Sequence, residues 1–299
     1  MNIRRKLIVM LVFLWLVPGC LYAAEVTLDY NGVVMNGNLE LAPGKSITEG
    51  VIVITHAGLA HNGMELYVYL QNLLKERGYS SLAVSWSFGI SNRHGMYDCK
   101  NTQQHLFTDG VGELEAWIKW LKQQSVKKVI LLGHSRGGGH ATLFLSEHDS
   151  EILAGLMLLA PDTKETNDVN SYRNQHHKEL KPILEKAKAM VSKGEGDSIM
   201  EHTDFLYCAN TRVAAKTIVS YYDDDPRLDT ANMIPGLHKP VLIVNAGNDE
   251  AIIGGEKYLK LAGKNVQVKI VEGAGHFFRD LFADEAVDEM TAFLDAIGF

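Results

Sequence analysis

The segment Gly133-His134-Ser135-Arg136-Gly137 joins an apolar run to a stretch with helical periodicity. A serine at such a junction is expected on a tight, strained turn that lifts its hydroxyl above the edge of a sheet. Glycines flank it because a side chain at either flank would collide with the neighbouring strand or helix. The pattern predicts that Ser135 is a nucleophile. His134 should point elsewhere, into packing or a supporting contact.

A serine hydroxyl becomes a good nucleophile only when a base accepts its proton. Of the 12 histidines, His276 alone combines a late position, a loop after a predicted strand and a flanking glycine. A carboxylate must then orient the imidazole and stabilise its cation. Asp249, just beyond the apolar run that ends at residue 246, is the predicted acid, and Glu250 is the alternative. The chain order is nucleophile, acid, base.

Acyl transfer also requires hydrogen-bond donors for a developing oxyanion. The backbone N–H of Arg136, directly after the serine, is the first expected donor. The second should come from the loop after the β-branched run 51–55, where we favour the N–H of Gly58 over that of Leu59.

Strands and helices alternate in the segments that must position these groups. Such alternation is typical of βαβ units and of a parallel sheet covered by helices on both faces. The predicted strands are 26–30, 33–41, 51–55, 81–86, 128–132, 152–159, 240–245 and 266–271, and the predicted helices are 65–77, 109–124, 137–146 and 281–297.

This alternation is interrupted between residues 162 and 238, which are polar and rich in predicted helix. Both flanks of the interruption continue the same sheet pattern. We therefore predict a core of residues 25–161 and 239–299, with 162–238 inserted above the sheet. One amphipathic stripe of the insertion comprises Leu180, Ile183, Leu184 and Ala187.

Four motifs together resemble the α/β-hydrolase superfamily. His56-Ala57-Gly58 stands at the oxyanion loop, with alanine where the family usually has glycine; GHSRG matches the nucleophile elbow, GND the acid and GH the base. The resemblance covers about residues 26–299, with 162–238 at the position of the variable cap. It implies an α/β-hydrolase fold: a mostly parallel eight-stranded sheet flanked by helices, with a helical cap insertion, catalysing acyl transfer to water without a cofactor.

The activity expected from this combination is that of an exported serine hydrolase, most simply a carboxylesterase acting on a small or medium acyl ester. Thioesterases, lipases and serine peptidases use the same apparatus and are the alternatives within the enzyme class. A non-catalytic envelope binding protein on a hydrolase scaffold is the alternative outside it.

The first 24 residues are typical of a secretory signal peptide. Arg4, Arg5 and Lys6 precede an apolar run over 7–17, and a small-residue stretch ends at Ala24. The run is short for a membrane-spanning helix. We expect a periplasmic or secreted protein, with lipidation of Cys20 as an alternative that would attach it to a membrane.

Export bears on the two remaining cysteines, Cys99 and Cys208. In an oxidising compartment they are the only pair able to form an intramolecular disulfide in the mature chain, and we predict that they do. We expect the long loop 86–105, which carries Cys99, to wall the pocket beside the insertion.

Composition excludes several other classes of protein. The 299 residues are 46% hydrophobic and 22% charged, as in packed globular proteins, and the net charge of −7 disfavours a nucleic-acid partner. No CxxC or HExxH spacing predicts a metal site, and no phosphate-binding or dinucleotide fingerprint predicts a cofactor. The expected partner is a small-molecule ester.

Overall fold

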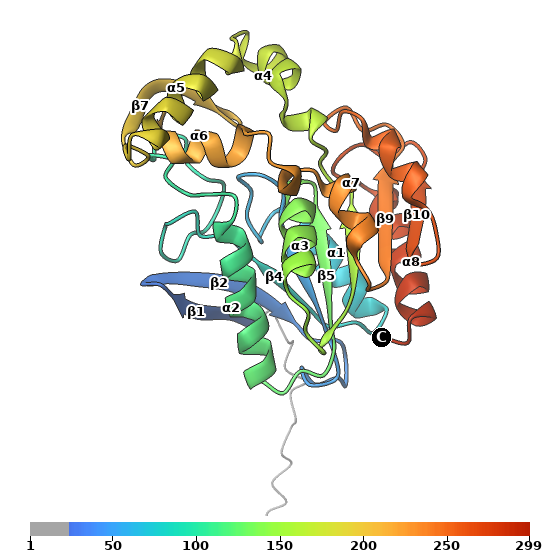
Figure 1. The fold of residues 1–299 in the computed structure, drawn as a ribbon. Coiled ribbons are helices and arrows are strands. Elements are labelled where there is room, and N and C mark those ends of the chain that lie inside the picture. The colour runs from blue at the N-terminus through green and yellow to red at the C-terminus, as the bar shows by residue number, and fades with distance from the viewer. Residues whose placement is uncertain (1–23) are drawn as a thin grey trace, which may run out of the picture.

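The computed structural model describes residues 24–299 and contains one large sheet of eight strands (Figure 1). The strand order is β1-β2-β4-β3-β5-β6-β9-β10, in which β2 is antiparallel to β1 and β4 and the remaining pairs are parallel. The predicted mostly parallel, eight-stranded α/β-hydrolase sheet is thereby confirmed. The predicted signal segment and Cys20 lie outside the described residues.

The strand bounds follow the apolar runs of the sequence to within a few residues. The six strands from β3 to β10 of this sheet run parallel, so their carboxyl ends lie at the same edge. The strands are β1 (Ala24–Tyr30), β2 (Val33–Glu40), β3 (Val51–Thr55), β4 (Ser81–Val84), β5 (Val129–His134), β6 (Leu153–Leu159), β9 (Val241–Ala246) and β10 (Val266–Val271).

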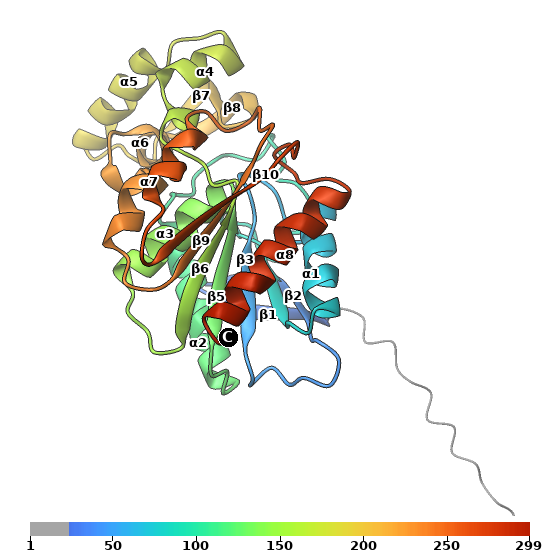
Figure 2. The ribbon, with the colours of Figure 1, turned by 90° about the vertical axis from the view of Figure 1, so that its right-hand side faces the viewer.

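Helices cover both faces of the sheet because its central strands are apolar on both faces. In β3, Val51 and Val53 face one hydrophobic core, whereas Ile52 and Ile54 face the other. Helices α2 (Asp109–Gln123) and α3 (Arg136–Glu147) cover the first core, and α1 (Glu65–Glu76) and α8 (Leu281–Ala296) cover the second. Figure 2 shows α1 and α8 side by side on their face.

Helix α1 differs in one detail from its predicted apolar stripe. Helical spacing in the predicted helix 65–77 assigns Leu66, Tyr69, Leu70, Leu73 and Leu74 to one apolar stripe. In the structure Tyr69 is 37% exposed, and Tyr67 is fully buried instead. Both positions lie beside the predicted Leu66 and Leu70, so helical spacing alone did not decide which tyrosine faces the sheet.

Between β6 and β9 the chain leaves the sheet and builds a separate layer above its carboxyl edge, at the top of Figure 1. This segment contains helices, as predicted, and also a two-stranded antiparallel sheet that the sequence analysis did not anticipate. Its elements are α4 (Val169–His176), α5 (Leu180–Ser192), β7 (Ile199–Phe205), β8 (Cys208–Ala214), α6 (Ala215–Tyr222) and α7 (Thr230–Met233).

Short 3₁₀ turns complete the connections around this layer and the last strands. They are η1 (Glu165–Asn167), η2 (Pro226–Leu228), η3 (Ile234–Gly236) and η4 (Gly255–Leu261). No helix within residues 24–299 combines the length and the apolar character needed to cross a bilayer.

Candidate active site

Ser135 lies between the end of β5 and the start of α3, at φ 53° and ψ −126°. This backbone conformation is strained for a residue with a side chain, and it persists because the surrounding packing holds it. A Cβ at Gly133 would lie 2.6 Å from the backbone nitrogen of Gly138, and one at Gly137 would lie 2.6 Å from the carbonyl oxygen of His56. The flanking glycines therefore allow the close approach of helix and strand that the sequence predicts.

Asp249 and His276 follow neighbouring parallel strands, β9 and β10, and meet at the same edge of the sheet. Asp249 Oδ2 lies 2.9 Å from His276 Nδ1, and both side chains are about nine-tenths buried. The other oxygen, Oδ1, accepts the backbone N–H groups of Ala251 at 2.8 Å and Ile252 at 3.0 Å. These bonds fix the carboxylate, which in turn holds Nδ1 and leaves Nε2 for another partner. The alternative acid, Glu250, is exposed.

The environment of Asp249 favours its charged form. Burial raises the pKa of this carboxyl, but the hydrogen bond and charge of His276, together with the two backbone N–H donors, outweigh burial. The pKa therefore lies below its ordinary value. A carboxylate that stays ionised is suited to stabilising an imidazolium.

Ser135 and His276 line one cavity of about 200 Å³ at this edge. Within residues 24–299 no direct hydrogen bond joins the serine hydroxyl to the imidazole. Such bonds are often long without substrate and tighten when it binds. Met96, from the loop 86–105, also lines the cavity, as expected for that loop.

The loop after β3 has two backbone amides available for an oxyanion. The N–H of Ala57 donates to Tyr67 Oη at 2.7 Å, whereas the N–H groups of Gly58 and Leu59 have no partner among the described residues. Leu59 lines the cavity and Gly58 does not. Arg136, whose N–H is the other predicted donor, is the first residue of α3 and also lines the cavity.

A buried chain of hydrogen bonds connects this loop to the imidazole. Tyr67 Oη, which accepts from Ala57, lies 2.9 Å from His134 Nδ1, and His134 Nε2 lies 2.9 Å from the carbonyl oxygen of His276. Since the carbonyl can only accept, Nε2 carries the proton and Tyr67 donates its hydroxyl hydrogen to Nδ1. Burial, reinforced by the charge of His276, lowers the pKa of His134 to about 3 and keeps the ring neutral.

Sequence reasoning anticipated a supporting contact for His134 but missed Tyr67. The signal that could have found it is the position of Tyr67 in the first turn of α1, close to the loop after β3 and two residues before Tyr69. A buried tyrosine hydroxyl requires a polar partner, and the nearest polar groups are those of the adjacent loop.

A second set of polar side chains lies beside the serine, comprising the buried Arg136 and Asp162 and the partly buried Asn167. Arg136 Nε is 3.9 Å from Asp162 Oδ2, and Asn167 accepts a hydrogen bond from Arg136 Nη2 while its Nδ2 donates to Asp162 Oδ2 at 3.1 Å. Burial raises the pKa of Asp162, despite the opposing charge of Arg136. Both side chains line the cavity, so its wall contains a partly compensated positive charge.

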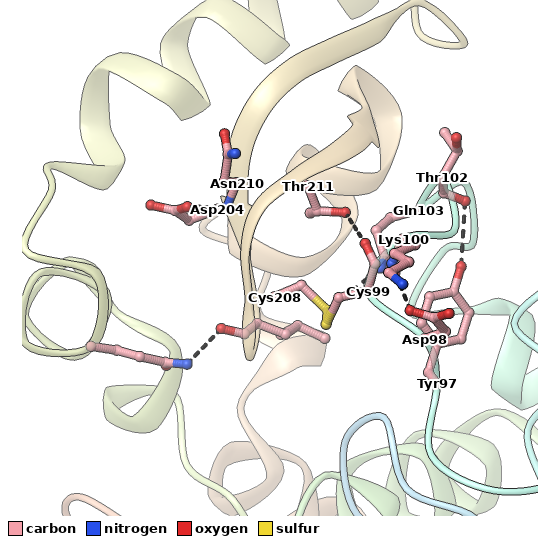
Figure 3. Close-up of a disulfide and its surroundings, with 12 residues drawn as sticks. Tyr97, Asp98, Cys99, Lys100, Thr102, Gln103, Asp204, Cys208, Asn210 and Thr211 are labelled. Carbon is pink, nitrogen blue, oxygen red and sulfur yellow. Dashed lines mark hydrogen bonds between the residues drawn. A yellow bond between two sulfur atoms is a disulfide. The ribbon is translucent and has the colours of Figure 1, made fainter.

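Cys99 and Cys208 form the predicted disulfide, which joins the loop 86–105 to the first residue of β8 (Figure 3). Thr211 Oγ1 donates to the carbonyl oxygen of Cys99 at 2.7 Å, beside the bridge. The residue before the bridge, Tyr207, lines the cavity, and a Cβ at Gly58 would lie 2.8 Å from its ring. The disulfide therefore holds a cavity-lining residue against the loop after β3.

Within residues 24–299 no group of three or more His, Cys, Asp or Glu side chains is arranged to hold a metal ion. The candidate residues of this site are a hydroxyl, an imidazole and a carboxylate, with backbone amides around them. Such a set is suited to nucleophilic acyl transfer.

Comparison with known proteins identifies the family of this chain. The model of the alpha/beta hydrolase family matches residues 52–292, which include all three candidate residues. The chain belongs to the alpha/beta hydrolase family.

Relatives by sequence carry esterase and lipase names. Phospholipase YtpA of Bacillus subtilis is 24% identical over 214 residues, covering 68% of this chain and 76% of that protein. A protein of Mycoplasma pneumoniae, provisionally named esterase/lipase 2, is 29% identical over 177 residues. That match spans 54% of this chain and 62% of the relative, so it covers less than two thirds of the relative's length. These relatives support an esterase or lipase type of hydrolase.

Solved structures share the fold at low sequence identity. Est1E from Butyrivibrio proteoclasticus, with ferulic acid bound, is 18% identical with a TM-score of 0.65, covering 90% of this chain and 99% of that one. A soluble variant of monoglyceride lipase from Saccharomyces cerevisiae is 15% identical with a TM-score of 0.64, covering 92% and 96%.

Proposed function

We propose that this protein is a serine carboxylesterase that cleaves small or medium acyl esters through an acyl-enzyme on Ser135. The observation that carries the proposal is the hydrogen bond that Asp249 accepts from His276 Nδ1. It lies at a cavity that the strained Ser135 also lines. The carboxylate orients the ring so that Nε2 is left to serve the serine.

In the proposed reaction Ser135 Oγ attacks the ester carbonyl carbon while His276 Nε2 takes the hydroxyl proton. The N–H groups of Arg136 and Gly58, or Leu59 in place of Gly58, stabilise the oxyanion. When the carbonyl re-forms, the bond to the alcohol breaks and His276 gives its proton to the leaving oxygen. Water then attacks the acyl-enzyme by the same route, which releases the acid and regenerates the serine.

Labelling with a fluorophosphonate probe tests the nucleophile. The wild-type protein should become labelled on Ser135 and hydrolyse p-nitrophenyl acetate, whereas Ser135→Ala should lose labelling and at least about a thousandfold in kcat. Equal labelling of the two proteins would overturn the proposed function and favour a binding protein. Matched esters, thioesters and amides would then separate carboxylesterase from thioesterase and peptidase activity.

We also propose that the protein is exported and that residues 162–238 act as a cap over the core of residues 25–161 and 239–299. The support for export is the pattern of charge and apolarity over residues 1–24, and for the cap it is the position of Tyr207 at the cavity. Mass spectrometry of the protein from envelope or culture fractions tests export. A mature N-terminus after Ala23 or Ala24 is expected, and a lipid on Cys20 would indicate anchoring instead.

A further inference from the structure

A second hollow lies beside the cavity of Ser135 and His276, along the outside of α1. This groove measures about 680 Å³, against about 200 Å³ for the cavity. Met64 and Phe277 line both spaces, so the groove and the cavity are adjacent. The larger space therefore lies outside the immediate surroundings of the serine, and only the side chains of these two residues are shared between the two spaces.

The walls of the groove are apolar near the cavity. Val68 of α1 and Phe277 are 42% and 39% exposed, and Phe278 behind them is buried. Polar and charged side chains of both signs, including Asn72 and Arg279, complete the lining. Exposed apolar side chains that line a hollow are typical of a binding site for an apolar ligand.

The groove is held open by the structure around it. Phe278 and Asp280 have positive φ angles of 42° and 57°, a conformation that non-glycine residues rarely adopt, and the segment they belong to turns Phe277 outward. On the opposite wall Tyr69 of α1 donates its hydroxyl to Asp284 of α8 at 2.8 Å. The two walls are therefore joined to each other, and the hollow exists before a ligand enters it.

The chemistry of the proposed reaction decides which part of an ester would reach this groove. His276 must protonate the leaving oxygen, so the alcohol part of the substrate has to lie beside His276. Phe277 follows His276 directly and lines both the cavity and the groove, so the groove is the larger space on the His276 side. The acyl part is left with the smaller cavity near Ser135.

We infer that the groove binds the alcohol moiety of the substrate, and that the preferred substrates are esters of short acids with long, apolar, uncharged alcohols. This inference rests on the proposed function and specifies its substrate class. Mixed charge in the lining gives no net attraction for an anionic group, which favours an uncharged alkyl or aryl chain.

Two substrate series test the inference. Alkyl acetates from ethyl to octyl lengthen only the alcohol, and p-nitrophenyl esters from acetate to octanoate lengthen only the acid. Each methylene that becomes fully buried is worth about fourfold in affinity. We expect kcat/KM to rise at least about tenfold from ethyl to octyl acetate, with no comparable rise along the p-nitrophenyl series.

Val68→Arg places a charge in the groove at a distance from the catalytic residues. It should reduce kcat/KM for octyl acetate by about tenfold and leave that for ethyl acetate within about twofold. The milder Val68→Ser should act in the same direction with a smaller effect. Val191→Arg is the matched control, because Val191 is a valine of α5 that is 38% exposed and lines neither space. It should change neither substrate.

The outcomes separate this inference from the function on which it rests. A flat alkyl series in an enzyme that cleaves p-nitrophenyl acetate would overturn the groove assignment and leave the esterase proposal intact. A chain-length gain confined to the acyl series and abolished by Val68→Arg would overturn the assignment to the alcohol. Failure to cleave any ester better than Ser135→Ala would overturn the proposed function itself.

Discussion

The two sides of the cavity lined by Ser135 and His276 are built by different means. On the sheet side, Ser135, Asp249 and His276 lie one to five residues beyond the ends of parallel strands, and short turns fix each of them. On the opposite side, residues of the segment 162–238 and of the loop 86–105 are joined by contacts between distant parts of the chain. The comparison teaches that the reactive groups depend on local geometry, whereas access to them depends on long-range packing.

Long-range packing on the second side centres on a disulfide and a buried histidine. His105 lies with Nδ1 2.9 Å from Tyr221 Oη and Nε2 3.0 Å from Gln103 Oε1. Phe88 and Phe205 pack their rings around it, from the loop and from β7. No single segment of the chain could form this cluster alone.

The largest effect should come from the sheet side. Asp249→Asn keeps the shape of the acid but removes its charge and presents a donor to Nδ1, so the imidazole loses its orientation and its stabilised cation. We expect kcat for p-nitrophenyl acetate to fall about 10³- to 10⁴-fold, with KM little changed. Glu250→Gln, one residue away and exposed, is the control and should keep full activity; similar losses in both variants would contradict the assignment of the acid.

A smaller effect, on stability, should follow removal of the disulfide. The bridge closes a loop across a separation of 109 residues. Cys99→Ser combined with Cys208→Ser should lower the free energy of unfolding by about 4–5 kcal/mol in the chain-entropy model. Urea unfolding measures the loss, and limited proteolysis should cleave first within residues 162–238. Reduced wild-type protein should behave like the double variant, and an unchanged unfolding midpoint would contradict the role of the bridge.

Acid should destabilise the whole protein through buried histidines that lie on both sides of the cavity. Burial lowers the pKa of His105 and of His140 to about 3, as it does for His134, so each binds a proton on unfolding below pH 6.5 but not while folded. The unfolded state then holds more protons, and stability should fall from pH 7 to pH 5, by up to about 1.4 kcal/mol per pH unit for each histidine. Burial raises the pKa of Glu113 to about 7, so this carboxyl binds a proton in the folded state over the same pH range. That uptake offsets the destabilising effect of one of the three histidines.

Urea unfolding at pH 7, 6 and 5 measures this dependence. His105→Gln should make the slope shallower, whereas His238→Gln, at an exposed position, should leave it unchanged. A slope that stays the same in His105→Gln would show that this ring is not the group that takes up the proton.

The smallest effect we expect comes from Tyr67→Phe, which removes one hydroxyl from the chain between the Ala57 amide and the carbonyl of His276. Two buried groups lose their partner, so kcat for a short ester should fall about tenfold and fluorophosphonate labelling should slow in parallel. Tyr79→Phe is the control, because the hydroxyl of Tyr79 bonds to Asp295 at 2.6 Å at the surface and Tyr79 lines neither the cavity nor the groove. Unchanged labelling in Tyr67→Phe would mean that the chain does not position the imidazole.

Much of the sheet side could be predicted from the sequence because its signals are local. The apolar run before Ser135, the glycines around it and the turns that carry Asp249 and His276 each fall within a few residues. Parallel pairing of β9 and β10 then brings the acid and the imidazole to one edge. The pairing of Cys99 with Cys208 could be predicted only because Cys20 falls in the predicted signal segment, which leaves no other partner.

The other side was less predictable because its strands lack a local signal. Polar residues interrupt the apolar pattern of Ile199–Phe205 and Cys208–Ala214, and these segments pair with each other and with Gln103 of a distant loop. Tyr67 was missed for a related reason: one turn of helix offers both Tyr67 and Tyr69, and only the fold places His134 beneath the first. Tertiary contacts decided both cases.

The contact between Tyr207 and Gly58 has a consequence for how such enzymes can be recombined. Because the tyrosine ring occupies the space that a side chain at position 58 would need, any residue larger than glycine at position 58 requires a different or displaced residue at position 207. A chimera that takes residues 162–238 from another family member would therefore need the loop after β3 from the same donor. Residues 162–238 and the core therefore cannot be exchanged separately between enzymes, because they contact each other at the loop after β3, which is proposed to bind the oxyanion.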